Sequence, residues 1–332
     1  MLLNRQLPAF NGVPATLASG AITTVTCKLN LGERIHVAWI QFGNDGATNP
    51  GQGIGTLKAP GMVQEIRVII DGKVQRRFTA QELNAINSLM NEPGSTEYTA
   101  KTSGTAASAG YRTMIPIFFA ERWRRGAVTV TGNNGPVAVP EAELSAWNLT
   151  GIETATIEVD LIGRTSAGAN AVLDGPVITG FYEYDALVQR NIGQIVKYKR
   201  FSFGPTSNPA EYTSLDRKTG SYQSLHLFPT SADQYVTTLM FTRDNVQVRQ
   251  DITRFQNDAI LLSNKMNPTA LDTASSTTKQ NTGLYNVVFD YDDQIRNLLG
   301  VSGVNELTLK PTYDSAPSGT QIIIAQITGD LD

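Results

Sequence analysis

Two short strands, a tight turn and a helix start occur together twice in the 332 residues, and this repeat constrains the fold more than any other feature. The first copy, IRVIIDGKVQRRFTAQELNAINSLMN, covers residues 66–91, and the second, LMFTRDNVQVRQDITRFQNDAILLSN, covers residues 239–264. The offset from residue 66 to residue 239 is 173, and it aligns an aspartate at the turn of both copies. A supersecondary unit that recurs in each half of a chain indicates a duplicated domain.

The turn residues of both copies favour the same hairpin. Asp71-Gly72 in the first copy supplies the two positive-φ positions that a type I′ turn requires. Asp244-Asn245 in the second copy suits the same turn, because asparagine tolerates positive φ better than most residues. Each copy is therefore predicted to form two antiparallel strands joined by a two-residue turn.

A helix is predicted directly after the first hairpin. Thr79 and Glu82 have the spacing of a capping box, in which each residue bonds to the backbone of the other. Leu83, Ile86 and Met90 follow at helical spacing, so this helix carries one apolar stripe.

The second copy predicts a helix at the same place from different residues. Asp251 is the predicted N-cap. Phe255, Ala259 and Leu262 form the apolar stripe of this second helix. The hairpin and helix are thus repeated even though most of the individual residues differ between the two copies.

A second, weaker echo supports the duplication. GIETATIEVD, residues 151–160, aligns with GVNELTLKPT, residues 303–312, at an offset of 152. Each half of the chain then has a hairpin and helix early and a glycine-led strand late. The shared order favours two copies of one β-rich domain.

Composition and length fit a mainly β protein made of two tandem eight-stranded jelly-roll barrels, each with one short helix after its hairpin. Twenty-nine glycines and 15 prolines favour short strands joined by turns. We expect an N-terminal jelly roll over residues 1–187 and a C-terminal one over residues 188–332. A propeller would show more copies at a shorter period, and an immunoglobulin array would lack the repeated helix.

Charge and hydropathy argue against several functions. The net charge of −3 gives no positive field for a nucleic-acid backbone. The longest apolar runs, such as residues 114–120, are far shorter than a bilayer-spanning helix, and the N-terminus lacks the pattern of a signal peptide. Cys27, the single cysteine, is expected to pack inside a strand.

No catalytic or cofactor-binding residue is predicted. The two histidines, His36 and His226, have no nucleophile motif around them, although a Ser-His-Asp arrangement stays open. Asp290, Asp292 and Asp293 are candidates for a structural calcium ion, but no calcium-loop consensus surrounds them. A solvated strand end is the preferred reading of these three carboxylates.

One local basic and aromatic cluster, ERWRR at residues 121–125, is a candidate interface. Its members Arg122, Trp123, Arg124 and Arg125 suit lipid headgroups, nucleic acid or the carboxylates of a neighbouring subunit. Because only Glu121 is close in sequence, an intersubunit salt bridge is the first expectation.

Several stretches together resemble a known family. They are LPAFNGVPA, IRVIIDGKV with the following ELNAIN, IPIFF, AWNLTGIETATIEVDL and, in the second half, VTTLMFTRDNVQV. The chain resembles the double jelly-roll major capsid proteins of icosahedral, internal-membrane bacteriophages, of the corticovirus type in the adenovirus and tectivirus lineage. The loops at residues 43–61 and 95–111 are longer than the family pattern.

The resemblance implies a structural protein and not an enzyme. It implies a homotrimer whose six barrels form a pseudo-hexameric capsomer of an icosahedral shell around an internal lipid membrane. Its partners would be itself, neighbouring capsomers, penton and minor capsid proteins, and the internal membrane by peripheral contact, with no specific nucleic acid. Its location would be the virion, after assembly in the host cytoplasm.

Two other classes remain open on the sequence. A minor capsid or spike protein, or a jelly-roll carbohydrate-binding protein, is the alternative, and the latter would stack sugars on Trp39, Trp123 or Trp147. A cupin-like oxygenase would need clustered histidine and carboxylate ligands, which two isolated histidines do not supply.

Overall fold

The computed structural model of the chain has two compact units. It describes residues 2–44, 62–90, 98–103, 110–124, 126–132, 135–163, 173–185, 195–217, 220–228, 236–268, 284–289 and 298–330. The first unit comprises Met1–Asn87, Glu92–Ile195 and Leu331–Asp332, and the second comprises Ser88–Asn91 and Val196–Asp330. The domain boundary predicted after residue 187 falls at residues 186–194, outside the described residues.

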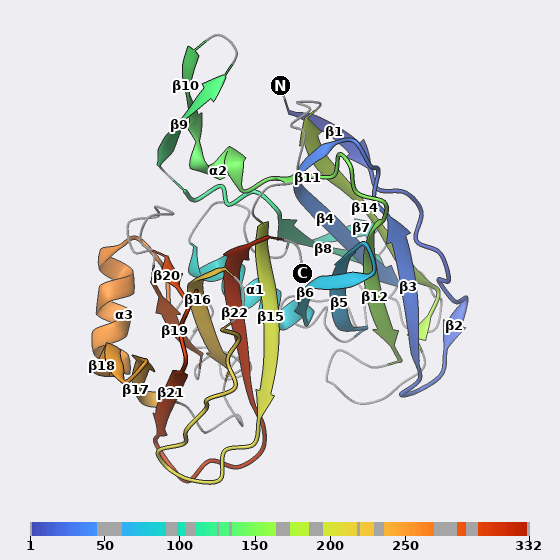
Figure 1. Ribbon diagram of the computed structural model, residues 1–332. Helices are drawn as coiled ribbons and strands as arrows, with labels where there is room; N and C mark the ends of the chain where they lie inside the picture. The colour runs from blue at the N-terminus through green and yellow to red at the C-terminus, as the bar shows by residue number, and fades with distance from the viewer. Residues whose placement is uncertain are drawn as a thin grey trace. The chain divides into compact units, whose positions relative to one another are not determined.

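The first unit has two antiparallel sheets, with strand orders β1-β14-β4-β8-β7 and β6-β5-β12-β3 (Figure 1). Strand β11 pairs with β4, and β13-β2 and β10-β9 are separate two-stranded pairs. The strands are β1 (Leu3–Gln6), β2 (Thr16–Leu17), β3 (Ile22–Lys28), β4 (Arg34–Asn44), β5 (Val63–Ile70), β6 (Lys73–Phe78), β7 (Tyr98–Ser103), β8 (Gly110–Phe118), β9 (Ala127–Gly132), β10 (Gly135–Pro140), β11 (Trp147–Asn148), β12 (Ala155–Ile162), β13 (Leu173–Asp174) and β14 (Pro176–Asp185).

The second unit also has two antiparallel sheets, with strand orders β19-β16-β22-β15 and β18-β17-β21, and β20 pairs with β16. Its strands are β15 (Ile195–Phe203), β16 (Ser221–Phe228), β17 (Val236–Arg243), β18 (Val246–Thr253), β19 (Tyr285–Val288), β20 (Leu299–Gly300), β21 (Leu307–Tyr313) and β22 (Gln321–Gly329). One apolar core joins side chains of both sheets, including Leu225, Phe241, Leu309 and Ile323. The unit is thus a sandwich of two sheets packed on a shared core.

The two predicted hairpins are present and use the predicted turn. Asp71 and Gly72, between β5 and β6, have φ values of 47° and 78°. Asp244 and Asn245, between β17 and β18, have φ values of 48° and 62°. Two consecutive positive φ angles are the signature of a type I′ turn, so the prediction from turn chemistry is confirmed in both units.

The turn aspartate of each hairpin also binds the segment before the strand that lies beside the hairpin in the sheet. The Oδ1 atom of Asp71 accepts hydrogen bonds from the backbone N–H groups of Glu153 and Thr154, at 2.9 and 2.8 Å. In the second unit, Oδ1 of Asp244 accepts from the backbone N–H groups at positions 305 and 306, at 2.8 and 2.9 Å. These amides lead into β12 and β21, which pair with β5 and β17 respectively. The two sequence echoes are therefore neighbouring parts of one duplicated arrangement.

A helix follows each hairpin, as predicted: α1 (Ala80–Leu89) and α3 (Arg254–Ser263). The capping box of α1 is confirmed, because the Thr79 N–H donates to Glu82 at 2.7 Å and the Glu82 N–H donates to Thr79 Oγ1 at 3.1 Å. A third helix, α2 (Glu141–Leu144), is a single turn that the sequence did not predict. In the described part of the chain, no helix has the length and apolarity to cross a membrane.

The predicted N-cap of α3, Asp251, is wrong. Strand β18 runs through Asp251 to Thr253, and Thr253 caps the helix. Thr253 and Gln256 form a capping box of the same kind as in α1, so the reciprocal pair fixes the helix start two residues later.

We predict that the turn aspartate stabilises each unit through its carboxyl oxygen. Asp71→Ala should lower the free energy of unfolding by about 2 kcal/mol, because it removes two hydrogen bonds and because alanine tolerates positive φ less well than aspartate. Asp71→Asn should be close to neutral, since the amide oxygen still accepts and asparagine tolerates this backbone. Urea unfolding of both variants, and of the same changes at Asp244, measures the difference. Equal loss in the alanine and asparagine variants would contradict the role of the oxygen.

Candidate functional site

The first unit contains a polar pocket of about 390 Å³. Its lining combines two arginines, a histidine and two carboxylates with three apolar residues. The lining residues are Leu2, Arg34, His36, Ala120, Arg122, Ala142, Glu143 and Asp185. We refer to this set as the polar pocket.

Two paired strands bring the central side chains together. Arg34 and His36 are two residues apart on β4, so their side chains leave the same face of the strand. Asp185 ends β14, and its Cα lies opposite that of Arg34 in the antiparallel pairing of β14 with β4. The pocket therefore forms where the start of β4 meets the end of its neighbour β14, at the ends of two interior strands of the sheet.

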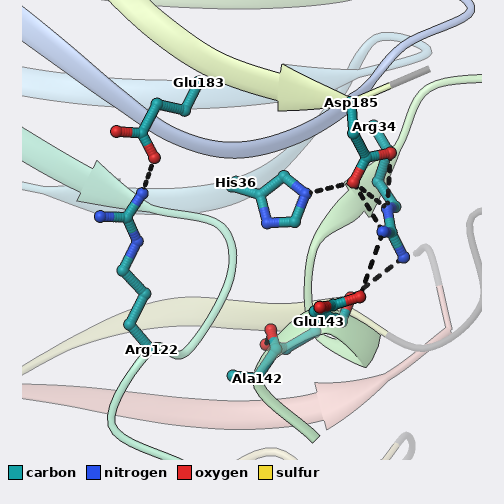
Figure 2. A network of polar contacts seen from close by, with 8 residues as sticks. Arg34, His36, Arg122, Ala142, Glu143, Glu183 and Asp185 are labelled. Atoms are coloured by element: carbon teal, nitrogen blue, oxygen red, sulfur yellow. Dashed lines mark hydrogen bonds and ion pairs between the residues drawn. The ribbon is translucent and has the colours of Figure 1, made fainter. Parts of the chain in front are cut away.

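Arg34 and His36 both bind the Asp185 carboxylate (Figure 2). The Arg34 Nη2 atom donates to Oδ2 at 2.6 Å, and Nε lies 3.0 Å from the same oxygen. His36 Nε2 lies 2.7 Å from Oδ2. All three residues are buried, and Glu143 Oε2 lies 3.6 Å from Arg34 as a second, more exposed partner. A buried carboxylate with two such partners is held in one orientation.

Arg122 forms the exposed side of the pocket. It makes an ion pair with Glu183 of β14, on the other side of the His36 ring in Figure 2. Its guanidinium also lies 5.6 Å from the centre of the Trp39 ring. Arg122 is thus positioned by partners within the chain and still reaches solvent.

The other predicted interface residues lie elsewhere. Trp123 and Arg124 are buried, and Arg124 Nε donates to Glu121 at 2.6 Å. Arg125 lies outside the described residues. The intersubunit role predicted for the ERWRR segment stays a prediction, with Arg122 as its exposed member in the described chain.

Burial lowers the pKa of His36 below its ordinary value, against the opposing effect of Asp185. The imidazole is therefore neutral at pH 7 and donates from Nε2 to the carboxylate. Within the described residues, no hydroxyl or thiol is bonded to this ring. The arrangement orients charges, and the described residues give the ring none of the hydroxyl or thiol partners of a catalytic triad.

A Ser-His-Asn arrangement occurs in the second unit, between β16 and its neighbour β19. Ser224 Oγ lies 2.8 Å from His226 Nε2, and His226 Nδ1 lies 2.7 Å from Asn286 Oδ1. The exposed fractions of the three residues are 1%, 0% and 2%. Gln326 also holds the serine, with its Oε1 2.5 Å from Oγ. Because a substrate must reach its nucleophile, this network is better explained as a set of buried polar groups that hydrogen-bond to one another.

The remaining candidates give no open site in the described residues. Burial raises the pKa of Cys27 to about 12, so its thiol is not a nucleophile at neutral pH. The described ranges contain no group of histidine, cysteine and carboxylate side chains that could hold a metal ion. The calcium candidates Asp290, Asp292 and Asp293 lie outside those ranges.

The tryptophans do not form an exposed platform for sugars. Trp123 and Trp147 are 6% and 1% exposed. Trp39 is half-buried, with Phe181 stacked on it at 4.7 Å and Arg122 near its ring. Stacking on a sugar ring needs an open aromatic face, and the faces of these three rings are already covered by other side chains of the chain.

No protein family and no curated protein sequence match the chain. Its structure is similar to the major capsid protein P2 of bacteriophage PM2, with 17% sequence identity and a TM-score of 0.67 over 100% of this chain and 98% of that one. It is similar to the structure of Sulfolobus turreted icosahedral virus, with 10% identity and a TM-score of 0.60 over 98% and 90% of the two chains. For the Faustovirus major capsid protein, the identity is 9% and the TM-score 0.57 over 99% and 90%.

These similarities extend over nearly the whole of each chain, so they include both units in the same order along the sequence. The chain has the double jelly-roll fold that its sequence predicted. The predicted resemblance to double jelly-roll capsid proteins is confirmed as a resemblance of fold.

We predict that acid weakens the fold through the two histidines, because burial lowers the pKa of both His36 and His226. In mild acid the unfolded chain then binds more protons than the folded chain. The free energy of unfolding is therefore not reduced by the histidines above about pH 7, and it falls as the pH drops below about 6.5. The slope is at most about 1.4 kcal/mol per pH unit for each histidine.

Urea unfolding at pH 7.5 and 5.5 measures this loss. The double variant His36→Gln/His226→Gln removes both histidines of the chain and should lose much less stability between the two pH values. His36→Gln alone serves as the milder variant, and its loss of unfolding free energy between the two pH values should be intermediate. An unchanged difference in the double variant would assign the acid sensitivity to other groups.

Proposed function

We propose that this chain is a viral major capsid protein. The observation that carries the proposal is the match of both units, over nearly the full length, to proteins whose known role is to form a capsid. The duplication within the chain gives this role a physical reason. A trimer of a chain with two similar barrels contains six similar barrels, so it approximates a hexagon and can tile a shell from one gene product.

The proposed assembly is a homotrimer that forms a pseudo-hexameric capsomer of an icosahedral shell around an internal lipid membrane. The partners are further copies of the chain, penton and minor capsid proteins, and the membrane surface by peripheral contact. The proposed location is the virion, after assembly in the host cytoplasm. A trimer of this kind needs interfaces of about 2,000 Å² or more to be permanent.

A structural role also agrees with the chemistry of the two polar sites. The polar pocket pairs its charges internally, and the Ser224–His226 pair is buried. Side chains of this kind fix strands relative to one another, which a shell subunit requires. We therefore infer that the protein acts through assembly and not through catalysis.

We predict that the purified chain is a trimer in solution. Light scattering at micromolar concentration should give three times 35.9 kDa, and negative-stain images should show particles of hexagonal outline. The same sample unfolded in denaturant serves as the monomer control. A stable 35.9 kDa species under native conditions would contradict the proposed capsomer.

A further inference from the structure

We propose that the outer face of α3 is a subunit contact that docks on a second copy of this chain. This inference rests on the proposed trimer and identifies one of its contact surfaces. The face consists of Phe255, Ala259 and Leu262, which we call the α3 stripe.

The α3 stripe is apolar and open in the described structure. Phe255 and Leu262 are 84% and 56% exposed, and Ala259 lies between them at helical spacing. Figure 1 shows α3 along the side of the second unit, where it contacts β17, β18 and β19. Large apolar side chains in a row on a helix surface indicate an interaction site.

The chemistry around the stripe selects a protein partner. The exposed positions of α3 are all uncharged: Phe255, Gln256, Ala259, Leu262 and Ser263. Arg254 and Asp258, on the flank of the helix, are only partly exposed and lie 3.8 Å apart as an ion pair. Depletion of charge around an aromatic anchor is typical of the core of a protein interface. An anionic membrane or a nucleic acid would instead require unpaired cations.

The duplicated helix α1 identifies the partner as another copy. When the N-caps of the two helices are aligned, the α3 stripe corresponds to Gln81, Ala85 and Ser88 of α1. Ala85 and Ser88 are only 1% and 4% exposed, so this face of α1 is covered. The second copy carries larger apolar side chains there, and the described chain leaves them uncovered.

In the proposed trimer, a neighbouring chain related by rotational symmetry covers the α3 stripe. In a closed ring of similar barrels, equivalent faces meet similar neighbours, and the neighbour of the second barrel can belong to the next chain. In the described residues, α3 carries an open stripe and the matching face of α1 is covered, so the proposed contact joins two unlike surfaces. A contact of that kind closes into a ring under threefold rotation, whereas a twofold dimer would need the stripe to meet itself.

The helix is held firmly enough to serve as a contact. Its capping box joins Thr253 and Gln256, with the Thr253 N–H donating to the glutamine side chain at 3.0 Å. On its inner face, Asn257 Nδ2 donates to the backbone oxygen of Asn286 at 2.7 Å, and Leu261 is fully buried. The stripe therefore projects from a helix that is anchored at its start and along its inner side.

The test replaces the stripe and measures the mass. Phe255→Asp/Leu262→Asp should convert the 108 kDa trimer, three times 35.9 kDa, to a 35.9 kDa monomer at micromolar concentration, with the circular dichroism of the folded protein retained. The matched control is Val246→Asp, which changes a 68% exposed apolar residue in the same unit and should stay trimeric. A trimeric double variant would overturn the docking role of α3 and leave the proposed function standing. A monomeric wild type would overturn the proposed function itself.

A second measurement decides the question if the double variant does not fold. Ala259→Cys places a thiol in the stripe, and Cys27 gives little background because it is buried and its pKa is raised to about 12. Maleimide labelling of this variant should be at least tenfold slower in the assembled trimer than after mild dissociation. Val246→Cys should label at the same rate in both states. Equal rates at position 259 in the two states would overturn the inference.

Discussion

One aspartate carboxyl in each unit fixes the arrangement on which the rest of the sandwich depends. It occupies a positive-φ turn position and accepts two backbone hydrogen bonds from a segment that is distant in sequence. Those bonds join residues 82 and 83 positions apart in the first unit and 61 and 62 positions apart in the second. The turn of each hairpin is therefore also bonded to the segment that leads into the neighbouring strand, so one side chain connects three adjacent strands.

The sequence predicted those parts of the fold that local chemistry determines. Asp71-Gly72 and Asp244-Asn245 require positive φ, and Thr79 with Glu82 can satisfy a helix start within four residues. The mainly β class and the duplication followed from the same signals. The position of the second helix start was missed because Asp251 is a good capping residue on its own. The capping-box spacing of Thr253 and Gln256, which Asp251 lacks, was the signal that could have placed it.

The sites could not be predicted because they depend on pairings between distant strands. Arg34 and His36 meet Asp185 only because β4 and β14 are neighbours in the sheet, and no spacing in the sequence indicates that. The arginines of residues 121–125 stand out in the sequence as a charge cluster, but their described partners are carboxylates of the same chain. The α3 stripe was visible as a pattern, while its exposure depends on which elements the fold places over it. Periodicity identifies a face, and only packing shows whether that face is covered.

The place of β22 in its sheet has a consequence for how the protein is made. This strand follows every other strand of the second unit along the chain, yet it lies between β16 and β15. Its side chains Ile323, Ala325 and Ile327 belong to the apolar core of the unit. A ribosome that has not yet reached residue 321 therefore carries a second unit without its middle strand, and chains released early have two unpaired strand edges and no closed core. The second sandwich can therefore form only after β22 has been made, although every other strand of the unit precedes it along the chain.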